Sequence, residues 1–174
     1  MPVRNVVLYP DERLRKKCRR VKEVNDEVLQ LIEDMAETMY SAHGVGLAAP
    51  QIGVNRRIIV FHAYQAEDDP RARLMGIVNP EIVERGPSSE FGEEGCLSIP
   101  GIRADVLRPT EVVIEGLDHE GDEILVELTE FEARVCQHEI DHLDGVLFTD
   151  HLDGLTREVL LRQYEEEQAN QKGK

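Results

Sequence analysis

Residues 129–145 read TEFEARVCQHEIDHLDG, and this stretch predicts the helix around which the fold is organised. Thr129, followed three places later by Glu132, forms the pattern of a capping box at a helix N-terminus. Gly145 stands where a helix C-terminus is expected. The two signals together predict one helix of about fifteen residues.

Two histidines, His138 and His142, are one helical turn apart in this stretch. At about 100° per residue they fall within roughly 40° of each other, and Glu139 lies at the edge of the same face. Phe131 and Val135 share this face, which predicts that the imidazoles emerge from an apolar stripe directed at the core. Histidines at this spacing with an acidic residue between them are typical of a metallohydrolase; histidines satisfied by hydrogen bonds are the alternative.

A catalytic metal site of this kind needs about three protein ligands, so a third ligand is expected from elsewhere. Cys136 points about 140° away from the histidine face, which predicts a core residue. Cys18 lies in the cationic run RKKCRR, which we interpret as solvated surface where neighbouring cations would lower the thiol pKa. Cys96 lies beside Gly95 in a turn next to apolar residues, from which a thiolate can approach the helix. Cys96 is therefore the preferred third ligand.

Two other classes of metallohydrolase use the same pentapeptide, which here is HEIDH at residues 138–142. The class that takes its third ligand from a later histidine is excluded, because that position is Phe148. The class whose third ligand is a glutamate on a later helix stays open, and the candidates are Glu158, Glu165 and Glu166. A metallopeptidase is thus the runner-up function, and a non-catalytic metal-binding module is a third class.

A third unusual stretch, residues 44–51, reads GVGLAAPQ and follows a predicted helix. The glycines on either side of Val45 permit positive φ and let another backbone approach closely. These properties suit a loop that lines a cleft, and a plain connection from helix to strand is the alternative.

Together the three stretches resemble the hallmark motifs of the peptide deformylase family. The motifs run from Gly44 to Gln51, from Glu94 to Ser98 and from Gln137 to His142. They occur in family order and at family spacing, and the resemblance weakens only in the last dozen residues. The resemblance implies hydrolytic removal of the formyl group from the N-terminal formyl-methionine of newly made polypeptides, with release of formate.

The resemblance also implies a role for individual residues. One divalent metal ion would be held by Cys96, His138 and His142. Glu139 would be the general acid and base, and Gln51 with the backbone N–H of Leu97 would form the oxyanion hole. In the family the physiological ion is usually Fe²⁺, while Zn²⁺, Ni²⁺ or Co²⁺ can also be bound. The residues alone do not choose between iron and zinc.

Substrate contacts follow from the same resemblance. Backbone groups of Val45, Gly46 and Gly95 are expected to pair with the substrate in the manner of a β-strand. The methionine side chain is expected to enter an apolar pocket near Phe131 and Val135.

Two arginines invite a hypothesis about support of this site. Arg134 is expected near the rim of the side-chain pocket, where it either tunes specificity or forms a surface ion pair. Arg103, which follows the cysteine motif, is predicted to hold Glu94 and so to fix the loop that carries the metal ligand.

Composition bounds the class of protein. The chain has 174 residues, 41% of them hydrophobic, which predicts a single catalytic domain over residues 1–174 with about the last eight residues disordered. It has no apolar run long enough to cross a membrane and no leader pattern at its N-terminus. Three cysteines disfavour a disulfide framework and suit a reducing compartment, so we expect a cytoplasmic protein. We also expect it to be of bacterial type and a monomer.

The charge balance concerns the partners. With 20 basic and 35 acidic residues the net charge is −15, which disfavours direct binding to nucleic acid. Proximity to the ribosome is implied by the family alone. Residues 152–174 carry four basic and five acidic side chains, so a basic helix that docks on the ribosome is not evident.

Periodicity places the remaining elements. Asn25 or Asp26 is predicted to cap a helix whose apolar residues keep helical spacing: Val28, Leu31, Ile32, Met35 and Met39. Strands are predicted at 58–61, 77–78, 103–107, 112–117 and 123–128, with an exposed loop at 67–70 and a turn at 120–122. The fold class expected is α+β, with antiparallel sheets packed around a central metal-binding helix and a C-terminal helix.

Overall fold

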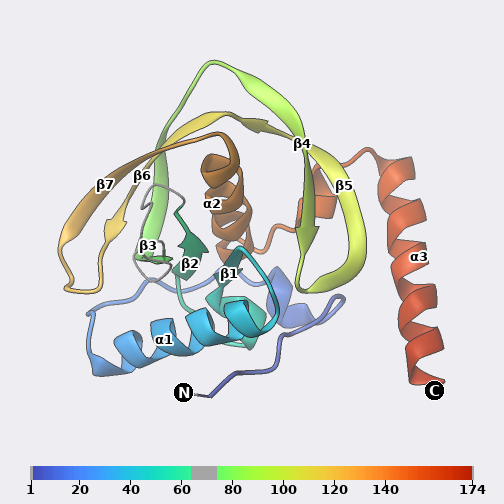
Figure 1. The fold of residues 1–174 in the computed structure, drawn as a ribbon, viewed down its shortest axis with the longest axis horizontal. Coiled ribbons are helices and arrows are strands. Elements are labelled where there is room, and N and C mark those ends of the chain that lie inside the picture. The colour runs from blue at the N-terminus through green and yellow to red at the C-terminus, as the bar shows by residue number, and fades with distance from the viewer. Residues whose placement is uncertain (1, 64–73, 174) are drawn as a thin grey trace.

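The computed structural model describes residues 2–63 and 74–173, and within them two antiparallel sheets surround one helix (Figure 1). The larger sheet has the strand order β1-β2-β3-β6-β7, and the smaller sheet is the hairpin β4-β5. The strands are β1 (Gly46–Ala48), β2 (Ile58–His62), β3 (Leu74–Arg85), β4 (Ser89–Cys96), β5 (Ile99–Pro109), β6 (Glu111–Leu117) and β7 (Glu123–Thr129). The α-helices are α1 (Asp26–Ser41), α2 (Glu130–Leu143) and α3 (Gly154–Lys172).

Strand β2 is buried between two helices. Its alternate residues Ile59 and Phe61 pack with the apolar side of α2, whereas Ile58 and Val60 pack with α1. A strand covered on both faces reads as a continuous apolar run, which is why residues 58–61 are all hydrophobic. The sequence prediction of a buried strand here is confirmed.

Helix α1 forms as predicted. The side chain of Asn25 accepts a hydrogen bond of 3.0 Å from the backbone N–H of Val28, which satisfies one of the free donors of the first turn. Four apolar residues of the predicted stripe are buried, and Ile32 packs beside them. This burial holds α1 against the larger sheet.

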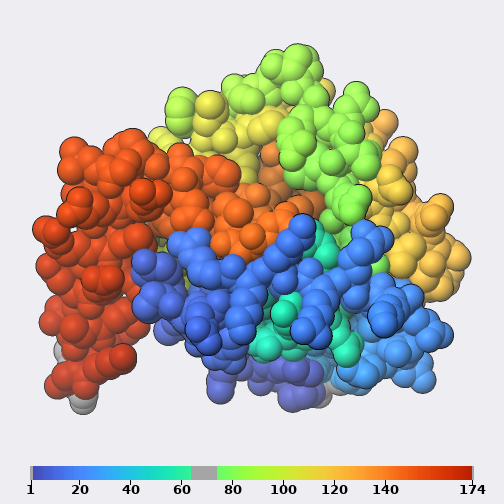
Figure 2. Space-filling view, turned by 180° about the vertical axis from the view of Figure 1, so that it is seen from behind, coloured from blue at the N-terminus to red at the C-terminus, as the bar shows by residue number. Residues whose placement is uncertain are grey.

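The hairpin β4-β5 encloses a second part of the core. Ile99, Ile102 and Val106 pack with Phe148 and with Tyr164 of α3, and the Tyr164 hydroxyl donates to the carbonyl of Tyr9 over 2.8 Å. Helix α3 therefore lies along the outside of the hairpin, and its last turns project beyond the rest of the molecule (Figure 2). Cys96 is the last residue of β4, so the hairpin delivers it to the interior.

The N-terminus of α2 differs from the prediction, whereas its C-terminus agrees with it. Thr129 is the N-cap residue, but its side chain makes no capping hydrogen bond, so the expected capping box is absent. Glu130 has a φ of 52°, and its N–H donates to the carbonyl of Thr110, so a sharp backbone turn from β7 replaces the box. Gly145, with a φ of 74°, follows the helix end as predicted.

Three further predictions have different outcomes. Cys18 is buried, not solvated, because its N–H donates to the carbonyl of Leu143 at the end of α2 and its side chain joins the core. Burial raises the pKa of this thiol to about 11, against the expected lowering by neighbouring cations. Helix α3 runs to Lys172, and the disorder expected of the last residues stays a prediction. The loop predicted at residues 67–70 lies outside the described residues.

Candidate metal centre

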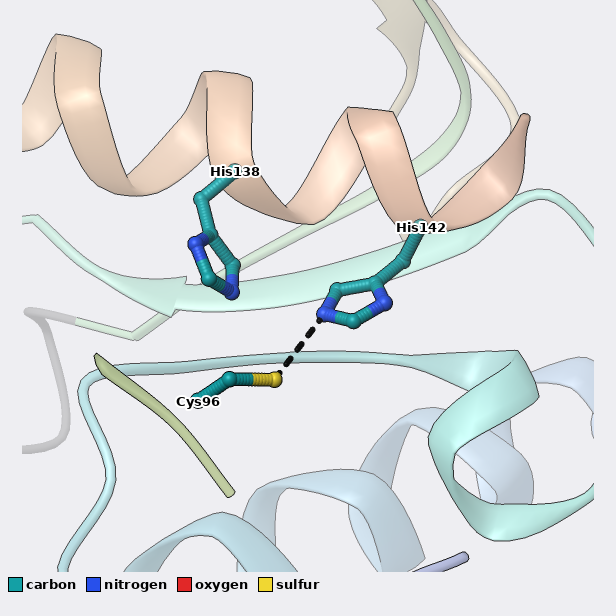
Figure 3. A group of neighbouring side chains, drawn as sticks. All are labelled: Cys96, His138 and His142. Atoms are coloured by element: carbon teal, nitrogen blue, oxygen red, sulfur yellow. Dashed lines mark hydrogen bonds between the residues drawn. The ribbon is translucent and has the colours of Figure 1, made fainter. Parts of the chain in front are cut away.

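Three side chains from two separate elements meet at the centre of the molecule. His138 and His142 point from the same side of α2 toward Cys96 (Figure 3). One ligand atom of each residue lies within 4.8 Å of the others, and Cys96 Sγ is 3.4 Å from His142 Nε2. The one-turn spacing on α2 and the end of β4 therefore create this group.

Glu94 fixes the orientation of the His138 ring through the Nδ1 atom. His138 Nδ1 lies 2.9 Å from Glu94 Oε1, and a carboxylate can only accept, so Nδ1 carries the proton. In the neutral imidazole, Nε2 then keeps a lone pair for a metal ion. Burial favours this neutral form, but hydrogen bonds to Cys96 and Glu94 outweigh burial and raise the pKa of His138 in the metal-free protein, so metal binding displaces a proton from Nε2. Although burial opposes ionisation, hydrogen bonds from Arg108 and His138 lower the pKa of Glu94 to about 2.

The residue that holds Glu94 is Arg108, which corrects the prediction of Arg103. Arg108 donates from Nε and Nη2 to the two carboxylate oxygens over 2.7 and 2.9 Å. Arg103 pairs with the exposed Glu93 over 2.6 Å. The reason is strand alternation: Ala104 is directly opposite Glu94, so residues two and four places further along β5 share its face, whereas Arg103 is on the other face.

Glu139 is a buried carboxyl group beside the cluster. Its Oε1 lies 3.7 Å from His138 Nε2, and its Oε2 has no hydrogen-bond partner among the described residues. Burial raises the pKa of Glu139 to about 7. A carboxyl group in this state can accept and return a proton near neutral pH.

The donors fit a divalent metal ion. Burial lowers the pKa of His142 well below its usual value, so this imidazole is neutral and available as a ligand. Its Nε2 and the His138 Nε2 face a cysteine sulfur, and one thiolate with two imidazoles suits Fe²⁺ or Zn²⁺. The other candidate third ligands, Glu158, Glu165 and Glu166, are exposed on α3.

The side chain of Gln51 is held in one orientation. Its Oε1 accepts from the N–H of Ala48 over 2.9 Å, and its Nε2 donates to Ser98 Oγ over 3.1 Å and to Cys96 Sγ over 3.6 Å. The amide N–H₂ group is thereby turned toward the metal cluster. Leu97 lies in the two-residue turn that follows Cys96, beside the same group.

A cavity of about 510 Å³ opens onto these residues. It is lined by every residue for which the sequence predicted a substrate contact, namely Val45, Gly46, Gly95, Phe131 and Val135. A Cβ atom at Gly46 would meet side-chain atoms of Glu139 and Val135 at 2.9 Å, so a glycine is needed for this strand to pass the helix. Phe131 is half exposed at the mouth, and Val135 is buried.

Residues 3–158 match the family described as polypeptide deformylase. The chain belongs to the peptide deformylase family. It is an enzyme of that family, and membership implies a divalent metal ion. The peptide deformylase of Hydrogenovibrio crunogenus is 47% identical over 167 residues, which cover 96% of each chain.

Solved deformylase structures share the whole fold. The peptide deformylase of Legionella pneumophila is 39% identical and superposes with a TM-score of 0.90 over 99% of each chain. The deformylase of Ehrlichia chaffeensis in complex with actinonin is 34% identical, with a TM-score of 0.88 over 96% of this chain and 98% of that chain. The α+β fold with its C-terminal helix is therefore shared along the full length.

Sequence reasoning missed two residues at the site and assigned a different role to Arg134. Arg108 and Ser98 hold Glu94 and Gln51, and neither was predicted to do so. Arg134 reaches the hairpin through several hydrogen bonds and is far more than a rim residue. The available signal was the alternation of β5, which would have favoured Arg108 if the register had been known.

Proposed function

We propose that this deformylase removes the formyl group from the N-terminal formyl-methionine of newly made polypeptides and releases formate. One observation carries the proposal: the buried carboxyl group of Glu139, one oxygen of which has no hydrogen-bond partner among the described residues, adjoins a cluster of one thiol and two imidazoles beside a cavity. This arrangement provides a base beside a metal site, as amide hydrolysis by water requires.

Cys96, His138 and His142 would hold the ion, and we propose Fe²⁺ as the physiological one. A bound divalent ion supplies Lewis acidity and lowers the pKa of water at the site. The neutral state of His142, the Nδ1 proton of His138 and the proximity of the thiol support this ligand set. Thiolate ligation suits iron or zinc more than magnesium or calcium.

Glu139 would accept a proton from the attacking water and then deliver it to the departing amine nitrogen. Its raised pKa, close to neutrality, suits both directions of transfer. Burial also keeps bulk water away from the carboxylate, so the proton is exchanged with the substrate. One carboxyl group thus serves bond formation and bond cleavage.

The carbonyl oxygen of the formyl group becomes negative as its carbon becomes tetrahedral. The Gln51 amide and the backbone N–H of Leu97 would donate to this oxygen, because both lie beside Cys96. Since the carbonyl of Gln51 is already engaged by Ala48, its N–H₂ group is oriented before substrate arrives. Donors fixed in advance favour the transition state over the ground state.

The substrate would lie along the cavity as an extended chain. Backbone groups of Val45, Gly46 and Gly95 would pair with it, and its methionine side chain would rest against Phe131 and Val135. We propose that actinonin, which a related deformylase binds, competes for the same cavity.

The expected setting is the bacterial cytoplasm, where a monomer meets nascent chains near the ribosome. The net charge of −15 argues against direct contact with nucleic acid. Among the described residues, none of the helices has the length and apolar character needed to cross a membrane.

The alternative of a metallopeptidase with a glutamate ligand finds no support. Its candidate ligands are exposed on α3, whereas Cys96 is adjacent to both histidines. The discriminating assay is formate release from formyl-Met-Ala-Ser under anaerobic conditions with Fe²⁺ or Ni²⁺, together with product analysis by mass spectrometry. We expect formate and an intact Met-Ala-Ser peptide. Internal cleavage of the peptide without formate release would favour the metallopeptidase. Actinonin should abolish formate release by the deformylase.

A further inference from the structure

Arg134 lies on the second turn of α2 with its side chain only 14% exposed. Its guanidinium crosses from the helix to both strands of the hairpin. Nη1 donates to the carbonyl of Val106 on β5 over 2.7 Å and to Glu94 Oε2 on β4 over 2.8 Å, with a longer contact of 3.3 Å to the carbonyl of Gly92. Nη2 donates to the carbonyl of Glu90 over 2.8 Å.

The backbone of β4 is shaped to admit this guanidinium. A Cβ atom at Gly92 would meet Arg134 Cζ, Nε and Nη2 at 2.7 to 2.8 Å, a separation that side chains do not tolerate. The missing side chain at residue 92 and the arginine at residue 134 are therefore complementary. A surface ion pair would need no such recess and would contribute little.

The contact of Arg134 with the hairpin matters because the metal ligands come from two parts of the fold, the hairpin β4-β5 and helix α2. Cys96 ends β4, whereas His138 belongs to α2. In the part of the chain that the structure describes, no strand of the larger sheet pairs with the hairpin. Glu94 connects the hairpin with α2, since it contacts His138 Nδ1 and lies two residues before Cys96. Whatever fixes Glu94 against α2 also fixes the distance between sulfur and imidazole.

Two arginines donate to Glu94, one from the hairpin and one from α2. Arg108 belongs to the hairpin and reaches α2 through Asp141 over 2.7 Å. Arg134 belongs to α2 and reaches the hairpin through three carbonyls and Glu94. The bonds of Arg134 to backbone carbonyls mean that it orients the strand itself and not the carboxylate alone.

We propose that Arg134 is a positioning residue that holds β4 at the place where Cys96 meets the two imidazoles. Loss of its guanidinium lets the hairpin move relative to α2, so the thiolate spends less time at ligand distance. The inference rests on the metal site of the proposed function and concerns metal retention, which can be measured without substrate.

The test compares Arg134→Met with the unaltered protein by competition with a chromogenic chelator for Zn²⁺, and by the absorption spectrum of the Co²⁺ form. Partners that orient metal ligands typically account for about 10- to 100-fold in affinity. We expect Zn²⁺ affinity to fall about 10-fold and the thiolate-to-cobalt charge-transfer band to weaken. Arg134→Lys, which can keep one or two of the bonds, should restore part of both.

Gly92→Ala perturbs the same contact without changing the arginine. Its Cβ would displace the guanidinium from the recess, so affinity and the cobalt band should fall in the same direction, by less. The double variant Gly92→Ala with Arg134→Met should bind no more weakly than Arg134→Met alone. Gly92→Ala also keeps the inference testable if the arginine variants fail to fold.

Arg4→Met is the matched control, because Arg4 makes two hydrogen bonds to Asp34 of α1 and neither residue lines the cavity. It should lower the thermal unfolding temperature and leave the cobalt spectrum unchanged. Unchanged affinity and spectrum in both Arg134→Met and Gly92→Ala would overturn the inference. A wild-type protein with no thiolate-to-cobalt band would instead overturn the metal site itself, so the two failures are distinguishable.

Discussion

Cys96 Sγ lies 3.4 Å from His142 Nε2, although the two residues are 46 positions apart in the chain. The contact joins the end of strand β4 to the last turn of helix α2. Because the two elements belong to separate layers, the site depends on how the hairpin packs on the helix. The predictions below test this dependence and the chemistry that follows from it.

Metal binding should protect one of the three cysteines from thiol reagents. Cys18 and Cys136 are buried, and burial raises the pKa of both thiols, that of Cys18 to about 11. Only Cys96 should therefore react quickly with a disulfide reagent at pH 8 in metal-free native protein. Zn²⁺ should suppress this reaction. Cys96→Ser should show no fast thiol in either state, and two fast thiols in native protein would contradict the assignment.

Replacement of Glu139 by glutamine should separate metal binding from turnover. The amide cannot accept a proton from water, so formate release should fall about 10²- to 10⁴-fold while Zn²⁺ remains bound. Steady-state formate assays with metal analysis on the same sample check this. Glu158→Gln, at an exposed position on α3, is the matched control and should keep full activity. Near-normal turnover of Glu139→Gln would remove the acid-base role.

Two arginines of β5 should differ sharply in their effect on the metal. Arg108→Met leaves Glu94 without its paired donors, so we expect Zn²⁺ affinity to fall about 10- to 100-fold. Arg103→Met removes only the exposed pair with Glu93 and should leave affinity unchanged. Chelator competition measures both. Equal losses in the two variants would mean that strand alternation does not decide which arginine supports the ligand.

Asp34 should make stability depend on pH below the neutral range. Burial opposes its ionisation, but hydrogen bonds from Gln30 and Arg4 outweigh this effect and lower its pKa in the folded protein. A lowered folded pKa gives stability that is present above the unfolded pKa and is lost as pH falls through the folded pKa.

The variant Asp34→Asn tests this linkage by urea unfolding at several pH values. It should be less stable than the unaltered protein by the same amount at pH 7 and pH 5, and the gap should close below about pH 4. Glu33→Gln, at an exposed position of the same helix, should show no such gap. A gap that persists in acid would mean that Asp34 contributes through packing, not through its charge.

Much of the site could be predicted from local pattern. The spacing of His138 and His142 needs only the helical period. Val28 and Met35 likewise followed from periodicity alone. The turn predicted at Gly95 and Cys96 was placed too early, because both residues belong to β4 and the turn follows at residues 97–98.

The failures concern contacts between distant segments. Choosing Arg108 over Arg103 needs the register of β4 against β5, which no local pattern supplies. Burial of Cys18 depends on the hydrogen bond from its backbone N–H to the carbonyl of Leu143. The cationic residues on either side of it predicted a solvated segment, which was wrong. The turn at Glu130 replaced a capping box because the preceding strand had to meet Thr110.

The most direct test of the central claim is a titration of metal-free protein with Fe²⁺ under anaerobic conditions, with formate release from formyl-Met-Ala-Ser measured at each step. The account predicts that release rises linearly and reaches a plateau at one ion per chain. In Cys96→Ser it should stay near the metal-free baseline at the same ion concentrations. Full formate release without added metal, or an equal plateau in Cys96→Ser, would contradict the account.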